Sequence, residues 1–305
     1  MTADIATLRI DCRNELGESP TWCEDSQTLY WVDVVQPGRV FQWRAAEDRV
    51  DFREIEDLAT GLNLVKEGGL LVHGARRLWH LHPATGKTTL LAMLPPAPSP
   101  MRFNDGRCDS VGRLWVGTMP NNIGENNEAL DIREHNGAIC AFSGTSLTTF
   151  EAGLGCPNAI CWSPDGERFY IADSCDGWIY CYRFDAASGS LSNRRPFCHF
   201  EGLGIPDGAC VDGDGYLWNA RWGAGAVARI APDGSLDRVL RLPVSQPTSC
   251  CFGDRDRRTL YITSARFGLS AEQLRSEPHA GGVFSVRLDV PGIEVSKYCS
   301  FPIGR

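Results

Sequence analysis

The chain has 305 residues and a net charge of −8 at neutral pH. This acidic balance argues against nucleic acid or an anionic membrane as the main partner. No apolar stretch approaches the length of a membrane span, and residues 1–5 lack the basic and apolar regions of a signal peptide. The thirteen cysteines are scattered and include no CxxC pair, which indicates small reduced core residues. We therefore expect a cytoplasmic protein.

One six-residue phrase occurs twice in the chain. Residues 153–158 read Gly-Leu-Gly-Cys-Pro-Asn, and residues 202–207 read Gly-Leu-Gly-Ile-Pro-Asp. An apolar stretch, a turn and an aromatic-rich strand follow each phrase in the same order. A recurrence at this spacing indicates a small structural unit that is used repeatedly. Asn158 and Asp207 are then predicted to occupy equivalent places in neighbouring units.

The same order of features divides the chain into six units. In chain order, the residues at the equivalent first position are Glu18, Glu67, Asn104, Asn158, Asp207 and Thr248. The strands that follow them are predicted at 29–33, 78–81, 114–117, 169–173, 217–220 and 260–263. A third strand that opens on glycine is predicted at 137–142, 177–182, 225–230 and 282–287. Short runs of β-branched and aromatic residues between Asp-Gly turns are typical of antiparallel hairpins, and no segment of helical length shows a sustained 3.6-residue period.

Six such units predict an all-β fold, a six-bladed β-propeller, with residues 1–305 as a single domain. A large double-sheet sandwich is the alternative, but it gives no reason for matching polar residues at matching points of every unit. We expect residues 5–13 and 293–301 to supply strands that close the ring. The proline-rich run at 95–100 is expected to be a stiff loop between two blades.

The first strand of each propeller blade is the innermost, so the six first-position side chains are predicted to point toward the central axis. Carboxylate and amide oxygens gathered in this way suit a hard divalent cation. Asn104, Asn158 and Asp207 are each typical of a turn when taken alone. Their shared register favours the ligand interpretation.

Four short motifs carry a resemblance to a known family: Glu18-Ser19-Pro20-Thr21-Trp22, Arg102-Phe103-Asn104-Asp105-Gly106, Pro157-Asn158-Ala159-Ile160-Cys161-Trp162 and Pro206-Asp207-Gly208. Together they resemble the SMP-30/gluconolactonase family, also called regucalcin-like, in order over nearly the whole chain. The resemblance implies a six-bladed propeller and a metal-dependent sugar lactonase.

The resemblance also implies a role for individual residues. Glu18, Asn158 and Asp207 would be the ligands of one divalent ion, which in this family is calcium, zinc, magnesium, manganese or iron(II). Asn104 and Arg102 would contact the substrate. Some members carry an acidic substrate-contacting residue shortly after the third blade's Gly-Thr-Met. Here Asn122 and Glu125 follow that motif, with Asn122 the candidate, so the sugar preference stays open.

A lactone is a cyclic ester, and a divalent ion can both polarise its carbonyl and activate a water molecule. The catalytic base would be either Asp207 or a hydroxide on the ion, while Arg102 would hold hydroxyl groups or stabilise the developing oxyanion. The implied partner is a small sugar lactone, and the protein would be a monomer or weak homodimer. Two alternatives stay open: hydrolysis of a phosphotriester or another ester, and a non-catalytic calcium-binding propeller.

Overall fold

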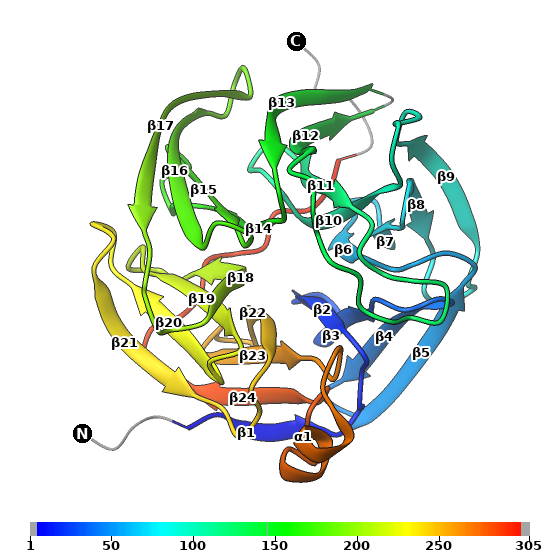
Figure 1. Cartoon of the computed structure of the whole chain (residues 1–305), viewed down its shortest axis with the longest axis vertical. Coiled ribbons are helices and arrows are strands. Elements are labelled where there is room, and N and C mark those ends of the chain that lie inside the picture. The colour runs from blue at the N-terminus through cyan, green and yellow to red at the C-terminus, as the bar shows by residue number, and fades with distance from the viewer. Residues whose placement is uncertain (1–4, 145, 300–305) are drawn as a thin grey trace.

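The computed structural model describes residues 5–144 and 146–299. Within this part of the chain the regular structure is almost all β-strand, in six antiparallel sheets of four strands each. Figure 1 shows these sheets as blades around a central axis. The predicted six-bladed β-propeller is confirmed.

The first three blades run from the innermost strand outward in chain order. Blade one consists of β2 (Gly17–Cys23), β3 (Thr28–Asp33), β4 (Gly38–Arg44) and β5 (Arg49–Ile55). Blade two consists of β6 (Gly61–Leu64), β7 (Leu70–His73), β8 (Arg77–Leu81) and β9 (Thr88–Met93). Blade three consists of β10 (Met101–Cys108), β11 (Leu114–Pro120), β12 (Gly137–Ser143) and β13 (Ser146–Leu154). The proline-rich run at 95–100 connects blades two and three, as expected.

The last three blades complete the ring. Blade four consists of β14 (Pro157–Trp162), β15 (Arg168–Asp173), β16 (Trp178–Asp185) and β17 (Ser190–Cys198). Blade five consists of β18 (Ile205–Val211), β19 (Leu217–Trp222), β20 (Ala226–Ile230) and β21 (Leu236–Arg241). Blade six consists of β22 (Pro247–Gly253), β23 (Thr259–Ser264), β24 (Val283–Arg287) and β1 (Thr7–Ile10). Because β1 pairs with β24, the N-terminal segment closes the ring as predicted.

The C-terminal part of that prediction is wrong. Residues 293–299 add no strand to a blade, and residues 300–301 lie outside the described residues. The segment instead crosses the end of the propeller as an extended chain. Tyr298 anchors it, since its backbone N–H donates to Leu64 O and its carbonyl accepts from Lys66 N. The buried Tyr298 ring also stacks on Phe142 at 5.7 Å between ring centroids.

Blade two departs from the predicted register. Glu67 was expected to begin its innermost strand, but it is exposed in the turn between β6 and β7. The strand expected second, 78–81, belongs to β8, the third strand. The blade's first two strands are only four residues long each, and Gly68 and Gly69, with φ of 98° and 87°, form the turn between them.

Aromatic side chains fill the spaces between neighbouring blades. Trp22 of blade one stacks on Tyr261 of blade six at 5.7 Å, and Trp115 of blade three meets Trp162 of blade four edge to face at 6.4 Å. Such pairs combine a large buried area with a defined geometry. This packing fixes each innermost strand relative to its neighbours, and therefore fixes the side chains at the axis.

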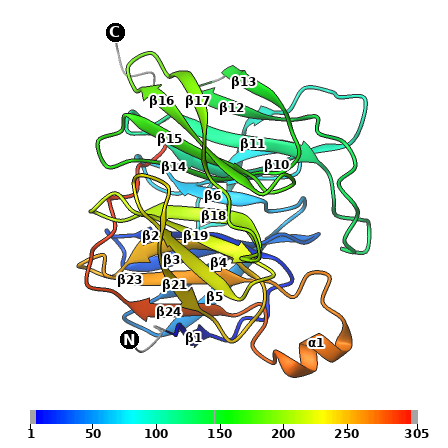
Figure 2. The same cartoon turned by 60° about the vertical axis from the view of Figure 1, so that its left-hand side comes forward.

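A single short helix, α1 (Ala271–Ser276), occurs among the described residues, where the sequence had indicated none of ordinary length. Ser270 and Gln273 form a capping box at its start. Figure 2 shows α1 outside the stack of blades, in the connection between β23 and β24. It is far too short and polar to cross a membrane, and no helix of the described residues could do so.

Candidate functional site

The starting ends of the innermost strands surround a polar cavity of about 340 Å³. Glu18 enters it from β2, Asn158 from β14 and Asp207 from β18. Arg102 and Asn104 enter from β10, and Asn122 from the loop after β11. All six candidate side chains therefore line one cavity, although they are far apart in the sequence.

A break in strand pairing recurs beside these side chains. The register shifts between Glu18 and Thr21 in β2, between Phe103 and Gly106 in β10, between Asn158 and Cys161 in β14, and between Pro206 and Ala209 in β18. A bulge releases residues from the regular alternation and redirects their side chains. The shared bulge explains why the equivalent first position of several blades faces the same cavity.

Arg102 and two amides form a hydrogen-bonded row along one wall. The Nη1 of Arg102 donates to Asn104 Oδ1 at 2.6 Å, and its Nη2 and Nε donate to Asn122 Oδ1 at 2.8 and 3.2 Å. Asn104 Nδ2 in turn donates to Asn158 Oδ1 at 2.9 Å. These hydrogen bonds fix the buried guanidinium of Arg102 at the cavity. Through Asn104 they also fix the orientation of the Asn158 side chain.

Ser174 is a site residue that the sequence analysis missed. Its hydroxyl accepts from Asn158 Nδ2 at 2.9 Å and donates to the carbonyl of Pro206 at 2.6 Å. It therefore ties Asn158 of blade four to the residue immediately before Asp207 in blade five. Ser174 follows the second strand of its blade, whereas the repeat drew attention only to first-strand positions.

The two carboxylates of the site are electrostatically unfavourable as anions. Burial, together with the charge of Asp105, raises the pKa of Glu18 to about 8. Burial and the charge of Glu18 raise the pKa of Asp207 well above its ordinary value. Arg102 and Arg107 oppose the shift at Glu18 but do not cancel it. Two buried carboxylates that repel each other are stabilised as a pair by a bound cation.

Asp105 is a third buried acid behind the site. Its Oδ2 accepts from Ile160 N at 3.0 Å, which links β10 to β14. Asp105 belongs to the motif at 102–106, in which the sequence analysis gave it no role. Its charge acts on Glu18 and on Asp207, although it does not line the cavity.

The prediction that all six first-position side chains point toward the axis is wrong for blades two and six. Glu67 lies in an exposed turn, away from the cavity. Thr248 is fully buried, and its hydroxyl donates to the carbonyl of Gly17. It therefore joins blade six to blade one and does not face the cavity. Of the two residues after Gly-Thr-Met, Asn122 lines the cavity and Glu125 is exposed outside it.

These features define a six-bladed propeller with an acidic, amide-rich cavity at one end of its axis. Residues 16–266 match the model of the SMP-30/gluconolactonase/LRE-like region. The chain belongs to this family, which confirms the resemblance seen in its motifs.

Individual relatives agree with this assignment. The chain is 36% identical to L-arabinolactonase of Azospirillum brasilense over 310 residues, which covers 99% of this chain and 98% of that protein. It is 33% identical to regucalcin of Danio rerio over 304 residues, with 96% and 99% covered. Among solved structures, the calcium-binding protein regucalcin from Agrobacterium tumefaciens matches with a TM-score of 0.89 and 27% identity, and covers 98% of this chain and 99% of that one.

Proposed function

We propose that this protein is a lactonase that hydrolyses a sugar aldonolactone with the help of one divalent cation held by Glu18, Asn158 and Asp207. The family and the relative named L-arabinolactonase support a lactonase-type hydrolase. The observation that carries the proposal is the gathering of two buried, mutually repelling carboxylates and an amide in one cavity.

The donor set fits a hard cation. Within the described residues, no group of three or more histidine, cysteine, aspartate or glutamate side chains is arranged as a metal cluster. The set proposed here instead has two carboxylates and one amide, all of them oxygen donors, which suits cations such as Ca²⁺, Mg²⁺ or Mn²⁺. The raised pKa values of Glu18 and Asp207 agree with this, because a cation would favour both anions.

The cavity also fits a small polar substrate. Its volume of about 340 Å³ lies at the lower end of the range for small-molecule sites. Trp222, Phe267 and Ile205 add apolar surface to the polar wall. A ring with several hydroxyl groups would find donors in Arg102 and Asn122 and an apolar surface in the same cavity.

When bound, the cation would polarise the lactone carbonyl and make a water molecule more acidic. Arg102, fixed by Asn104 and Asn122, would donate to substrate oxygens and stabilise negative charge as the carbonyl is attacked. Asp207 would take the proton of the attacking water. The ring oxygen would leave as a hydroxyl group, which yields the open aldonic acid.

The test is to strip the protein with a chelator, add back single metals, and follow proton release from a panel of five- and six-carbon aldonolactones. The proposal predicts that hydrolysis disappears with the metal and returns with at least one added cation. A calcium-binding role without catalysis is the second candidate, because the matched Agrobacterium regucalcin is a calcium-binding protein. In that case chelation would lower the melting temperature, while no lactone of the panel would be opened at any stage.

A further inference from the structure

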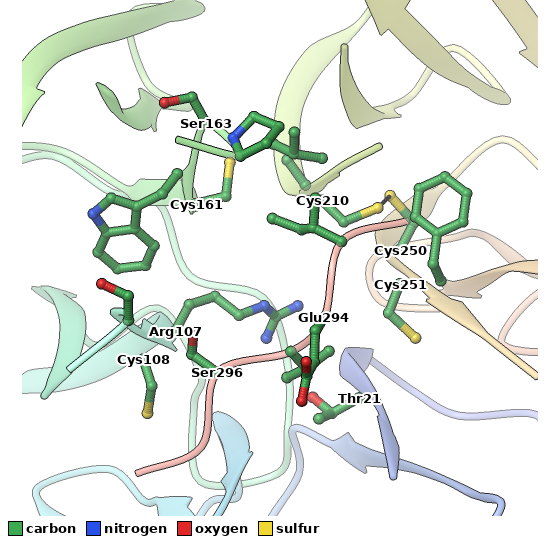
Figure 3. A pocket seen from close by; sticks show the side chains of 18 of the residues that line it. Thr21, Arg107, Cys108, Cys161, Ser163, Cys210, Cys250, Cys251, Glu294 and Ser296 are labelled. Carbon is green, nitrogen blue, oxygen red and sulfur yellow. Dashed lines mark hydrogen bonds between the residues drawn. The ribbon is translucent and has the colours of Figure 1, made fainter. Parts of the chain in front are cut away.

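A second cavity, of about 300 Å³, lies at the finishing ends of the innermost strands. It shares no lining residue with the polar cavity at the starting ends. Figure 3 shows the side chains that surround it, including those of Arg107, Cys161, Cys210, Cys250 and Cys251. The C-terminal segment contributes residues 293–296 to its wall. We call this space the thiol cavity.

Two of its cysteines lie close together. The Sγ atoms of Cys210 and Cys250 are 3.5 Å apart, and Figure 3 shows them facing each other. Cys210 lies on β18 and Cys250 on β22, the innermost strands of adjacent blades. These strands run in close contact, since a Cβ at Gly208 of β18 would meet Ser249 of β22 at 2.1 Å. A disulfide holds its sulfurs about 2 Å apart, so closing the pair takes side-chain rotation and a small approach of the strands.

The two thiols differ in access. Both cysteines line the thiol cavity, but Cys210 is half-buried, whereas Cys250 is completely buried and its thiol donates to the carbonyl of Trp218 at 3.3 Å. A small reagent in the cavity therefore reaches Cys210 first. Cys250 is placed behind it, where it can attack a modified Cys210 and complete a disulfide.

One positive charge faces this group. Arg107 projects into the cavity, where its Nη1 donates to Ser19 Oγ at 3.1 Å. The charge of Asp105 raises the pKa of Arg107 despite its burial. Burial, followed by the contact with Cys250, raises the pKa of Cys210 well above its ordinary value. The thiolate is the reactive form of cysteine, and the raised pKa keeps its fraction small, so the pair is defined by the 3.5 Å separation of its two sulfurs and by the access of Cys210 to the cavity.

We propose that Cys210 and Cys250 are a dithiol pair that hydrogen peroxide entering the thiol cavity oxidises to a disulfide between blades five and six. The sulfur of Cys210 attacks a peroxide oxygen, the O–O bond breaks, and a sulfenic acid and one water form. Cys250 then attacks the sulfur of that sulfenic acid, and the S–O bond breaks to release a second water. In total, the pair loses two hydrogens and the peroxide is reduced to water.

The experiment treats the full chain with a limited amount of hydrogen peroxide, blocks the remaining thiols, and maps disulfides by mass spectrometry without reduction. The proposal predicts that both thiols of the pair disappear before the other cysteines react, in one cross-linked peptide that dithiothreitol separates again. Cys181, which is buried outside the cavity, provides the internal reference. Equal oxidation of Cys181, or a disulfide that excludes Cys210 or Cys250, would overturn the proposal.

Two variants test the order in which the two cysteines react. Cys250→Ser is expected to lose the cross-link and to accumulate a sulfenic acid on Cys210 that dimedone traps. Cys251→Ser, a neighbour in the same cavity, is the matched control and is expected to keep the cross-link. A trapped sulfenic acid on Cys251 in place of Cys210 would contradict the assignment. The peptide map of the unmodified sequence decides the question even if the Cys250 variant fails to fold.

Discussion

The two ends of the propeller axis are built by the same innermost strands but carry different chemistry. At the starting ends, Asn158 of β14 and Asp207 of β18 present oxygens to the polar cavity. At the finishing ends, Cys161 and Cys210 of the same two strands present sulfurs to the thiol cavity. The fold supplies two convergent sites, and the residues at each determine what it can do. Hard oxygen donors suit a divalent cation, whereas paired thiols suit oxidation.

Asp105 and Arg107 carry opposite charges and lie between the two ends of the axis. The charge of Asp105 raises the pKa of Glu18 on one side and that of Arg107 on the other. The charge of Asp105 thus disfavours the anionic form of Glu18 in the absence of a cation at the polar cavity. It also keeps Arg107 charged at the thiol cavity. The comparison predicts that changes at the starting ends affect cation binding and turnover, and that changes at the finishing ends do not.

The largest effect is expected from Asp207→Asn. Removing the negative charge and the proposed proton acceptor should lower kcat by about 100-fold or more, with weaker cation binding as well. Steady-state lactone hydrolysis with saturating metal measures it. Glu125→Gln serves as the control because Glu125 is exposed outside the cavity. Near-full turnover of the Asp207 variant with metal bound would exclude Asp207 as the base.

The second prediction concerns pH. The folded-state pKa of Glu18, about 8, lies above its ordinary value of 4.5, so the metal-free fold binds the extra proton between these values. Metal-free stability should therefore fall as pH rises from about 4.5 to about 8, because the unfolded chain releases that proton earlier. A cation must displace the proton of Glu18, and that of Asp207 where it is bound, so its affinity should rise by at least about tenfold per pH unit in this window. Calorimetric titrations at several pH values measure it, and a flat affinity would contradict the site.

Arg102→Lys is expected to raise KM by about tenfold, since a lysine cannot reproduce the planar donors that meet Asn104 and Asn122. Lactone saturation curves measure the change. Arg77→Lys, an exposed arginine in blade two, is the matched control. An unchanged KM would remove Arg102 from substrate contact.

Ser174→Ala should have a smaller effect, about threefold to tenfold on kcat/KM, because one neutral hydrogen bond to Asn158 is lost while the ligands stay. The same loss should appear as slightly weaker cation binding in a calorimetric titration. If catalysis falls but cation binding is untouched, Ser174 does not act through Asn158.

The smallest effect is expected from Cys210→Ser. The side chain lies at the thiol cavity and makes no contact with the polar cavity among the described residues, so cation affinity and kcat should stay within about twofold of the unmodified protein. A large loss would show that the two ends of the axis are coupled, and would end the separation described here.

The repeated phrase was enough to predict the fold, and with it the convergence of Glu18, Asn158 and Asp207. The rule worked because the innermost strand of each blade lies at the axis, so equivalent positions on these strands come close together. It failed at Glu67 and Thr248. Glu67 lies in the turn between β6 and β7, out of register with the other first positions. The hydroxyl of Thr248 donates to the carbonyl of Gly17, so its side chain is buried away from the cavity.

Other features depend on contacts between blades, which the amino-acid sequence alone does not show. Ser174 reaches Asn158 and Pro206 only because blades four and five are adjacent. The cysteines were predicted to be small reduced core residues, and the contact of Cys210 with Cys250 was missed because it joins two strands that are distant in the sequence. The bulges beside Glu18, Asn158 and Asp207 also follow from strand pairing, and residue spacing alone does not reveal them.

The most direct test of the central claim is anomalous diffraction from crystals soaked in Mn²⁺. We predict one strong peak in the polar cavity, within coordination distance of oxygens of Glu18, Asn158 and Asp207, and its loss in Asp207→Asn. A peak elsewhere with this cavity empty, or lactone hydrolysis that continues undiminished in such crystals after the metal is removed, would contradict the account.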